Sequence, residues 1–239
     1  MKVKRWFVVS VVVVLCLVVL ALGGLRLVNS RTFQVAGEIV PRVETREKVV
    51  ALTFDDGPTP GYTEEVLGTL EPEDVEATFY LIGEEIERHP EEAERIVAAG
   101  HELGNHSYSH RRMVFVSGDL VEEEVEDTDR LIREAGYKGE ISFRPPYGKK
   151  LVALPRFLGR TGRTTVTWDV EPESVPELEG DAGGISTHVL ENAGPGSIIL
   201  LHPMYDGRGA SREAIAPIIR GLKDRGYRFV TVSELLEMR

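Results

Sequence analysis

The chain has 239 residues, of which 42% are hydrophobic and 28% charged, a balance typical of one globular domain with an appended segment. Five of its 28 basic residues and none of its 39 acidic residues lie within the first 31 positions, so the remaining 23 bases face 39 acids and carry a net charge of −16. A surface this negative repels phosphate backbones and argues against nucleic-acid binding. The single cysteine, Cys16, excludes an intramolecular disulfide framework, so metal ligands must be His, Asp or Glu.

The N-terminal segment has the length and composition of a membrane-spanning helix. Trp6–Leu25 contains no charged residue and is interrupted by a single polar residue, Ser10. At about 1.5 Å per residue, a helix of this length crosses the roughly 30 Å hydrocarbon core of a bilayer. By the positive-inside rule, the basic residues before it keep the N-terminus in the cytoplasm and place everything after about Asn29 outside; these residues are Lys2, Lys4 and Arg5.

A cleaved signal peptide is the alternative interpretation, with Ala21-Leu22-Gly23 as the cleavage site. The apolar core of a signal peptide usually has about 7–15 residues, which favours a retained anchor here. We therefore expect a single-pass protein of the cell membrane, which contacts lipid through its N-terminal helix and is secreted if the anchor is cleaved. The expected organisation is a cytoplasmic tail and anchor over residues 1–30, a stem over 31–47 and one domain over 48–239; the sequence leaves the oligomeric state open.

Strand and helix signals alternate from Val49 onward. Short β-rich runs predict strands over residues 49–54, 77–82, 101–105, 140–143, 164–168, 197–201 and 228–231. Capping residues and glycine stops predict helices between and after them, over residues 90–99, 117–135, 211–225 and 234–238.

This alternation indicates parallel βα units, arranged as a barrel or as a doubly wound sheet. Polar residues directly follow several predicted strands, and the carboxyl ends of barrel strands converge on one mouth where catalytic groups lie. These residues are Asp55, Asp56, His106, Arg144, Glu171 and His202. We therefore expect an α/β fold, a distorted and incomplete (β/α) barrel of about seven parallel strands with an N-terminal transmembrane helix.

Two adjacent carboxylates, Asp55 and Asp56, end the first predicted strand within the sequence Thr-Phe-Asp-Asp-Gly-Pro. Two like charges side by side are costly unless a cation or an arginine neutralises one of them. Asp-Asp-Gly-Pro alone is typical of a surface turn, but a buried-looking strand precedes it here, which favours a functional pair.

Two histidines follow the third predicted strand in the sequence His106-Ser-Tyr-Ser-His110. Their spacing places both imidazoles on one face if the segment forms a helical turn. Two histidines and one carboxylate form a triad suited to a divalent metal, with positions left open for water and substrate. This spacing is weak on its own and much stronger beside Asp55-Asp56.

Two further segments place polar groups after strands. The sequence Phe-Arg-Pro-Pro-Tyr-Gly over residues 143–148 presents Arg144 and the amide of Tyr147 rigidly, because its prolines fix the backbone. Leu200-Leu201-His202 ends an apolar strand with a histidine, which alone is as typical of a core residue as of a catalyst.

Together, the sequences TFDDGP, HSYSH, RPPYG and LLH resemble the motifs of the polysaccharide deacetylases, carbohydrate esterase family 4 or the NodB-homology domain. The resemblance extends from about Lys48 to Met238. It implies that Asp55 is the general base, that Arg144 orients it and that His202 is the general acid. It further implies that the Tyr147 amide helps to bind the oxyanion and that three residues hold the metal: Asp56, His106 and His110.

One segment departs from the family pattern. Residues 168–174 read Trp-Asp-Val-Glu-Pro-Glu-Ser, with Ser174 where the family has a second tryptophan. Glu171 or Glu173 is expected to support His202, and the sequence does not decide between them.

We therefore expect a metal-dependent hydrolase that removes N-acetyl groups from an extracellular glycan, such as peptidoglycan or chitin-like amino sugars, and releases acetate. The ligand set favours Zn²⁺, and Co²⁺, Ni²⁺ or Mn²⁺ also fit. The alternatives are a catalytically silent glycan-binding module and a hydrolase of a small non-peptide amide or an O-acetyl ester.

Overall fold

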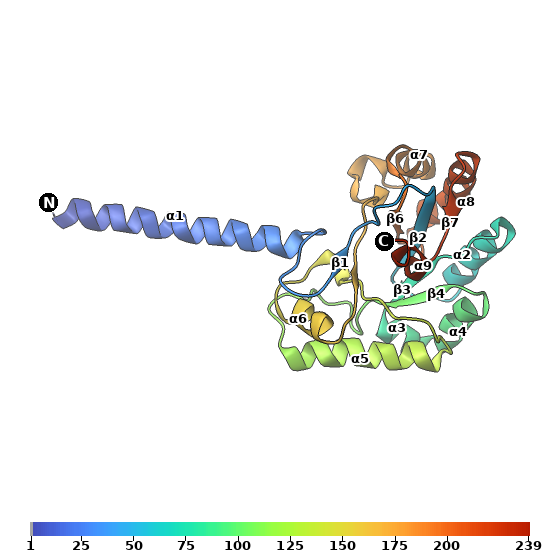
Figure 1. Ribbon diagram of the computed structural model, residues 1–239, viewed down its shortest axis with the longest axis horizontal. Coiled ribbons are helices and arrows are strands. Elements are labelled where there is room, and N and C mark those ends of the chain that lie inside the picture. The colour runs from blue at the N-terminus through green and yellow to red at the C-terminus, as the bar shows by residue number, and fades with distance from the viewer. Residues whose placement is uncertain (1) are drawn as a thin grey trace.

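The computed structural model describes residues 2–239 and shows a long N-terminal helix that projects from an α/β domain (Figure 1). Met1, the first residue of the predicted cytoplasmic tail, lies outside the described residues. Helix α1 (Lys2–Asn29) is long and apolar enough to cross a membrane, and none of its apolar window, Val9–Asn29, is buried against the domain. A signal sequence and a membrane anchor both fit these properties.

Strand β2 (Val49–Asp55) forms the centre of a parallel sheet, and each of its residues is buried. It pairs with β3 (Thr78–Leu81) on one side and with β6 (Ser197–Leu201) on the other. β3 in turn pairs with β4 (Glu102–Asn105), and β7 (Arg228–Phe229) pairs with the beginning of β2. The pairing register brings the carboxyl ends of β2, β3, β4 and β6 to one edge of the sheet.

A second, two-stranded unit closes the sheet toward a barrel. β1 (Ile39–Val40) pairs in parallel with β5 (Thr165–Val166). Isolated bridges join this unit to both sides of the sheet: Asn105 with Phe143, Phe143 with Thr165, and Val170 with Ile199. The result is a distorted, incomplete barrel, which confirms the expected fold class.

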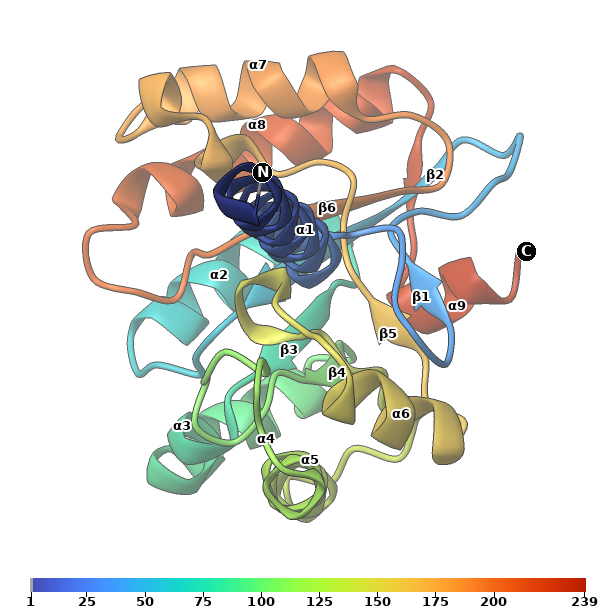
Figure 2. The same cartoon turned by 90° about the vertical axis from the view of Figure 1, so that its left-hand side faces the viewer.

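Helices surround the barrel, as Figure 2 shows from the side on which α1 leaves the domain. Their bounds are α2 (Tyr62–Leu70), α3 (Gly83–Arg88), α4 (Pro90–Ala98), α5 (Gly118–Glu134), α6 (Ala153–Arg160), α7 (Ala182–Asn192), α8 (Gly209–Asp224) and α9 (Val232–Leu236). Short 3₁₀ turns occupy Glu71–Glu73, Pro146–Gly148, Pro172–Ser174 and Pro176–Leu178.

The alternation of side chains along β2 separates two apolar cores. Val50, Leu52 and Phe54 belong to the larger core, which also contains the buried residues of α8. Val49 and Ala51 belong to a second core with residues of β3, β5 and β6. Since successive side chains of a strand point to opposite faces, Asp55 continues the row that begins at Val49. The last position of that row therefore places a carboxylate at the mouth of the barrel.

Several predicted elements differ in detail from the structure. The strand expected over residues 140–143 is reduced to bridges at Phe143, and β7 covers only the first half of residues 228–231. β1 was not expected: it lies within the segment expected as a stem, where Val40 and Val43 are buried in the second core. Part of that segment therefore packs on the domain, because its short apolar stretch finds β5 as a partner distant in sequence.

Candidate active site

The two adjacent carboxylates lie where β2 ends and the chain turns. Asp56 has a φ of 74° and its backbone N–H donates to the carbonyl oxygen of Tyr80, 3.1 Å away. Gly57 follows with a φ of 67°, and a Cβ at this position would lie 3.0 Å from the sulfur of Met204. The turn therefore requires glycine at position 57, and it lets both carboxylates line the same cavity.

The two motif histidines lie in a loop after β4, and the expected helical turn is wrong. Ser107 and His110 have φ values of 66° and 53°, because the side-chain oxygen of Asn105 accepts a hydrogen bond from the Ser107 amide at 2.9 Å and curls the chain. The His110 amide donates to the Ser107 hydroxyl at 3.1 Å. The loop still brings the rings of His106 and His110 together, with 5.0 Å between their centroids.

Asp56, His106 and His110 form a set that fits a divalent metal ion. Oδ1 of Asp56 lies 3.2 Å from Nε2 of His110 and 3.7 Å from Nε2 of His106, and the three ligand atoms lie within 4.8 Å of one another. Oδ1 of Asp56 is buried and has no hydrogen-bond partner among the described residues. A bound cation would satisfy that oxygen, so the residues present fit the metal that the sequence predicts.

The surroundings hold both histidines in the form that binds metal. Nδ1 of His106 donates to the backbone carbonyl oxygen of Arg144 at 2.8 Å, which leaves the Nε2 lone pair directed toward Asp56. Burial lowers the pKa of His106 and of His110, so both rings stay neutral near pH 7. Neutral imidazole is the ligand form.

Asp55 lies beside this set, with its Oδ2 3.6 Å from Nε2 of His106, and a buried arginine fixes its orientation. Arg144 is fully buried, and its Nη1 donates to Oδ1 of Asp55 at 2.6 Å and to the hydroxyl of Thr53 at 2.8 Å. Its guanidinium carbon lies 4.0 Å from the ring centroid of Tyr80. Burial alone would raise the pKa of Asp55, but the charge of Arg144 and its hydrogen bond, together with the charge of His202, keep it below its ordinary value. Asp55 is therefore an ionised carboxylate with a fixed orientation.

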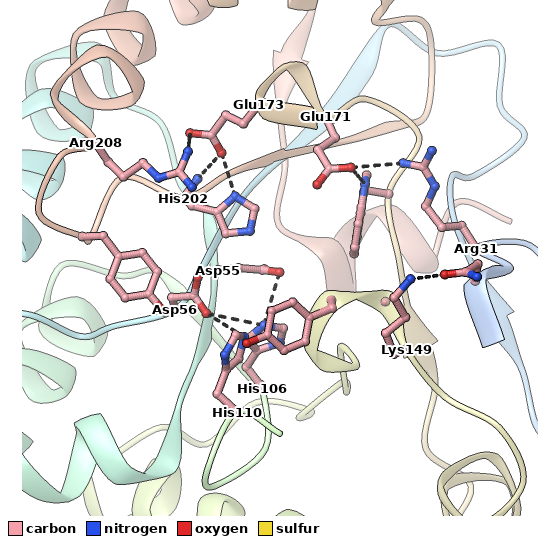
Figure 3. Close-up of a pocket in the computed structure, with 15 residues that line it drawn as sticks. Arg31, Asp55, Asp56, His106, His110, Lys149, Glu171, Glu173, His202 and Arg208 are labelled. Atoms are coloured by element: carbon pink, nitrogen blue, oxygen red, sulfur yellow. Dashed lines mark hydrogen bonds and ion pairs between the residues drawn. The ribbon is translucent and has the colours of Figure 1, made fainter. Parts of the chain in front are cut away.

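A second fixed pair, His202 and Glu173, lies across the cavity (Figure 3). Oε2 of Glu173 accepts from Nδ1 of His202 at 2.7 Å and from the His202 amide at 2.8 Å. Burial opposes the charged imidazole, but the Glu173 hydrogen bond and the charges of Asp55 and Asp56 raise the pKa of His202 to about 9. Nε2 is thus free to hold a proton toward the cavity.

Of the two glutamates between which the sequence left the choice open, Glu173 contacts His202. Glu171 instead accepts from Nε1 of Trp168 at 2.8 Å and forms an ion pair with Arg31 at 3.4 Å. The 3₁₀ turn that begins at Pro172 separates the two side chains.

One cavity of about 550 Å³ brings the predicted residues together. All of them line it except Arg144, which lies behind Asp55. Tyr147 has a φ of 57°, and its half-exposed ring lies 4.7 Å from the ring of His110, centroid to centroid. Tyr205, which follows His202 closely and is expected near the mouth of the barrel, also lines the cavity. The lining residues that sequence reasoning missed as site residues are Asn29, Arg31, Gly148, Lys149, Trp168 and Arg208. Lys149 follows a recognised motif directly, whereas no sequence signal connects Asn29 or Arg31 with the cavity.

Three metal ligands beside a carboxylate–arginine pair and a histidine–carboxylate pair define a metal-dependent hydrolase. The polysaccharide deacetylase family model matches residues 42–166. The chain is 36% identical over 203 residues to a peptidoglycan-N-acetylglucosamine deacetylase of Bacillus cereus, an alignment that covers 85% of this chain and 95% of that protein. The chain belongs to the polysaccharide deacetylase family and is a hydrolase of carbon–nitrogen bonds.

Solved structures agree with this assignment. The crystal structure of the Bc1960 peptidoglycan N-acetylglucosamine deacetylase matches with a TM-score of 0.77 at 33% identity, and covers 83% of this chain and 92% of that one. A CE4 family pseudoenzyme from Bacillus anthracis matches with a TM-score of 0.75 at 29% identity, over 83% of this chain and 69% of that one. Since the fold is shared with a pseudoenzyme, activity depends on the residues of the cavity.

Proposed function

We propose that this protein removes N-acetyl groups from the amino sugars of peptidoglycan, outside the cytoplasmic membrane, and releases acetate. The observation that supports this most is the juxtaposition, in one cavity, of the metal-ligand set with Asp55 and His202. The Bacillus cereus relative, which the chain covers almost completely, is named for this substrate.

We assign Asp56, His106 and His110 as the metal ligands. A divalent metal held there would supply a Lewis acid that polarises the acetyl carbonyl and would lower the pKa of a water molecule toward about 7. Two histidines and one aspartate favour zinc, although other borderline divalent ions fit the same donors.

Asp55 is assigned as the general base. Its depressed pKa keeps it ionised at neutral pH, and its carboxylate is free to accept a proton through Oδ2, because Arg144 binds Oδ1. Arg144 does not line the cavity, so it is a positioning residue that acts through Asp55. Because Arg144 fixes Asp55, the general base is already oriented at the start of each turnover.

His202 is assigned as the general acid. Its raised pKa keeps the ring protonated at neutral pH, so Nε2 can give its proton to the amine as the carbon–nitrogen bond breaks. Glu173 positions the ring through Nδ1. The backbone amide of Tyr147 is assigned to the oxyanion, where the loss of one donor typically costs about 2.7–4 kcal/mol.

The N-terminal helix is proposed to remain as an anchor, with the N-terminus cytoplasmic and the domain outside. The proposed organisation keeps residues 1–30 as tail and anchor, 31–47 as stem and 48–239 as the deacetylase domain. The length of the apolar helix supports retention, since it exceeds an ordinary signal-peptide core. Extraction of membranes with alkaline carbonate, followed by detection of the full-length chain, tests it.

Acetate release from N-acetylated peptidoglycan by the full chain in detergent tests the activity. Activity should disappear with a chelator, return on addition of one metal, and be lost in Asp55→Asn. Binding of the glycan without turnover under any metal would instead support a silent glycan-binding module. Activity that survives both metal removal and Asp55→Asn would exclude the proposed chemistry.

A further inference from the structure

We propose that the face of the domain from which α1 leaves docks on the outer surface of the same membrane, through an apolar cavity rimmed by arginines that accepts an anionic phospholipid. The inference rests on the retained anchor proposed above. We call this surface the anchor face and define it by Phe33, Val35, Phe115, Val152, Arg156 and Arg160.

The exposed large apolar side chains of the domain lie in the segment after α1, around one apolar cavity and at the active site. In the part of the chain that the structure describes, those outside α1 are Phe33, Val35, Phe115, Tyr147, Val152 and Tyr205. Two of them, Tyr147 and Tyr205, line the active-site cavity. The other four lie in the segment after α1 or in the connections that precede α5 and α6, and Phe115 is 92% exposed. Phe115 and Val152 line one cavity, and exposed apolar residues that gather in this way mark an interaction surface.

A cavity of about 430 Å³ lies within the anchor face. Phe115, Val116 and Gly118 contribute one wall, and residues 151–153 with α6 contribute the other. No acidic residue lines this cavity, although acids outnumber bases 39 to 28 in the chain. The charged residues that do line it are Arg156 and Arg160, and no carboxylate lies within ion-pairing distance of either among the described residues.

The anchor face is continuous with the end of α1. Lys149 contacts the side chain of Asn29, and Lys150 contacts the backbone of Ser30. The segment beyond them runs against α6, since a Cβ on Gly37 would lie 2.9 Å from the Cα of Gly159. In Figure 2, which looks along α1 onto this side of the domain, α6 lies toward the viewer and α5 is seen end-on.

These observations together identify a lipid surface as the partner. A helix that crosses the bilayer and ends at Asn29 brings the anchor face to the headgroup level, where the phenylalanines can enter the interface. The positive charges of Arg156 and Arg160 attract anionic headgroups. The rest of the domain repels such headgroups, because residues 32–239 carry a net charge of −16. The acids of α5 begin at Asp119, just beyond the cavity, and mark the edge of the face.

A fluorescent probe on the full chain in vesicles tests the inference. With Cys16→Ala as the background, an environment-sensitive probe is attached at Phe115→Cys, and at Lys138→Cys as the matched exposed control beyond the other end of α5. In vesicles of phosphatidylcholine and phosphatidylglycerol, the probe at 115 should report an apolar environment and be quenched by brominated lipid. The probe at 138 should behave as in water.

Arginine variants then test the headgroup. Arg156→Ala with Arg160→Ala should lower the ratio of docked to undocked probe by about 25-fold, from about fivefold for each arginine. Vesicles of phosphatidylcholine alone should have the same effect. The double arginine variant should turn over a soluble N-acetylated oligosaccharide at the unchanged rate.

Three outcomes would overturn the inference. A probe at 115 that stays aqueous in anionic vesicles, in a chain that resists carbonate extraction, would refute docking while leaving the anchor intact. Release of the chain by carbonate would refute the anchor itself. A probe that responds to soluble glycan strands but not to vesicles would assign the face to substrate. The fluorescence readout does not require deacetylase activity, so failure of the proposed function would be seen separately.

Discussion

Replacing Glu173 with glutamine should shift the alkaline limb of the activity profile toward lower pH. Glu173 accepts a hydrogen bond from His202 and raises its pKa from the ordinary 6.5 to about 9 together with Asp55 and Asp56. A proton on His202 is needed for the general acid, so activity persists below this pKa and is lost as the pH rises through it. Glutamine preserves the shape of the side chain but removes its charge.

The magnitude follows from the two protonation states. At pH 8, a histidine of pKa about 9 is about 90% protonated, whereas one of pKa 6.5 is about 3% protonated. Turnover at pH 8 should therefore fall by up to about 30-fold, the limit in which the whole rise in pKa is lost, and by less to the extent that Asp55 and Asp56 maintain it. At pH 6 the same change lowers turnover by less than about twofold. A cation bound by Asp56, His106 and His110 would lower the pKa of His202 in the wild-type protein and in Glu173→Gln alike. The difference in pH between their alkaline limbs is therefore the quantity to compare.

The assay is kcat measured from pH 5 to 10 on one N-acetylated oligosaccharide, with metal content determined for each protein. Glu171→Gln is the matched control, because Glu171 lines the same cavity without contacting His202 and should leave the limb in place. Glu173→Asp keeps a negative charge, so its alkaline limb should lie between those of the wild-type protein and Glu173→Gln. An unchanged limb in Glu173→Gln, with unchanged metal content, would refute the proposed pairing.

Four further substitutions test the roles of neighbouring residues. Asp56→Ala should abolish stoichiometric metal binding, measured by elemental analysis, and with it the activity, whereas Asp55→Asn should keep the metal and lose about 10²–10⁴-fold in kcat; equal metal loss in both would contradict the separation. Arg144→Met should lower the free energy of unfolding in urea at pH 7 by about 3–5 kcal/mol, because it leaves Asp55 buried and unpaired, and a wild-type midpoint would refute that dependence. Gly57→Ala should destabilise by about 1–3 kcal/mol, since alanine at a φ of 67° is strained and meets Met204; full stability in the same titration would show that the turn adapts.

The barrel and most of its site could be predicted from the sequence because the chemistry lies at strand ends. Short β-rich runs locate β2, β4 and β6, and the site residue at the end of each run, or directly after it, is Asp55, His106 or His202. Parallel strands bring these positions to one edge whatever the intervening loops do. The motif residues therefore did not depend on accurate loop conformations.

What could not be predicted depends on local backbone conformation in two places and on a contact between segments distant in sequence in a third. The His106–His110 loop is curled by Asn105 rather than helical, although the histidine spacing fits both. The choice of Glu173 over Glu171 depends on the direction of one 3₁₀ turn. β1 was missed because two residues carry no periodicity and take their structure from β5.

The junction at Asn29 and Arg31 limits the distance from the membrane at which the active site can act. Both residues line the active-site cavity, so no flexible tether separates a retained α1 from the catalytic groups. The radius of action would then be about the width of the domain itself. Glycan strands close to the bilayer would be deacetylated soon after their synthesis. Older glycan further from the membrane would lie out of reach, so the deacetylation of a strand would depend on its distance from the membrane while it is new.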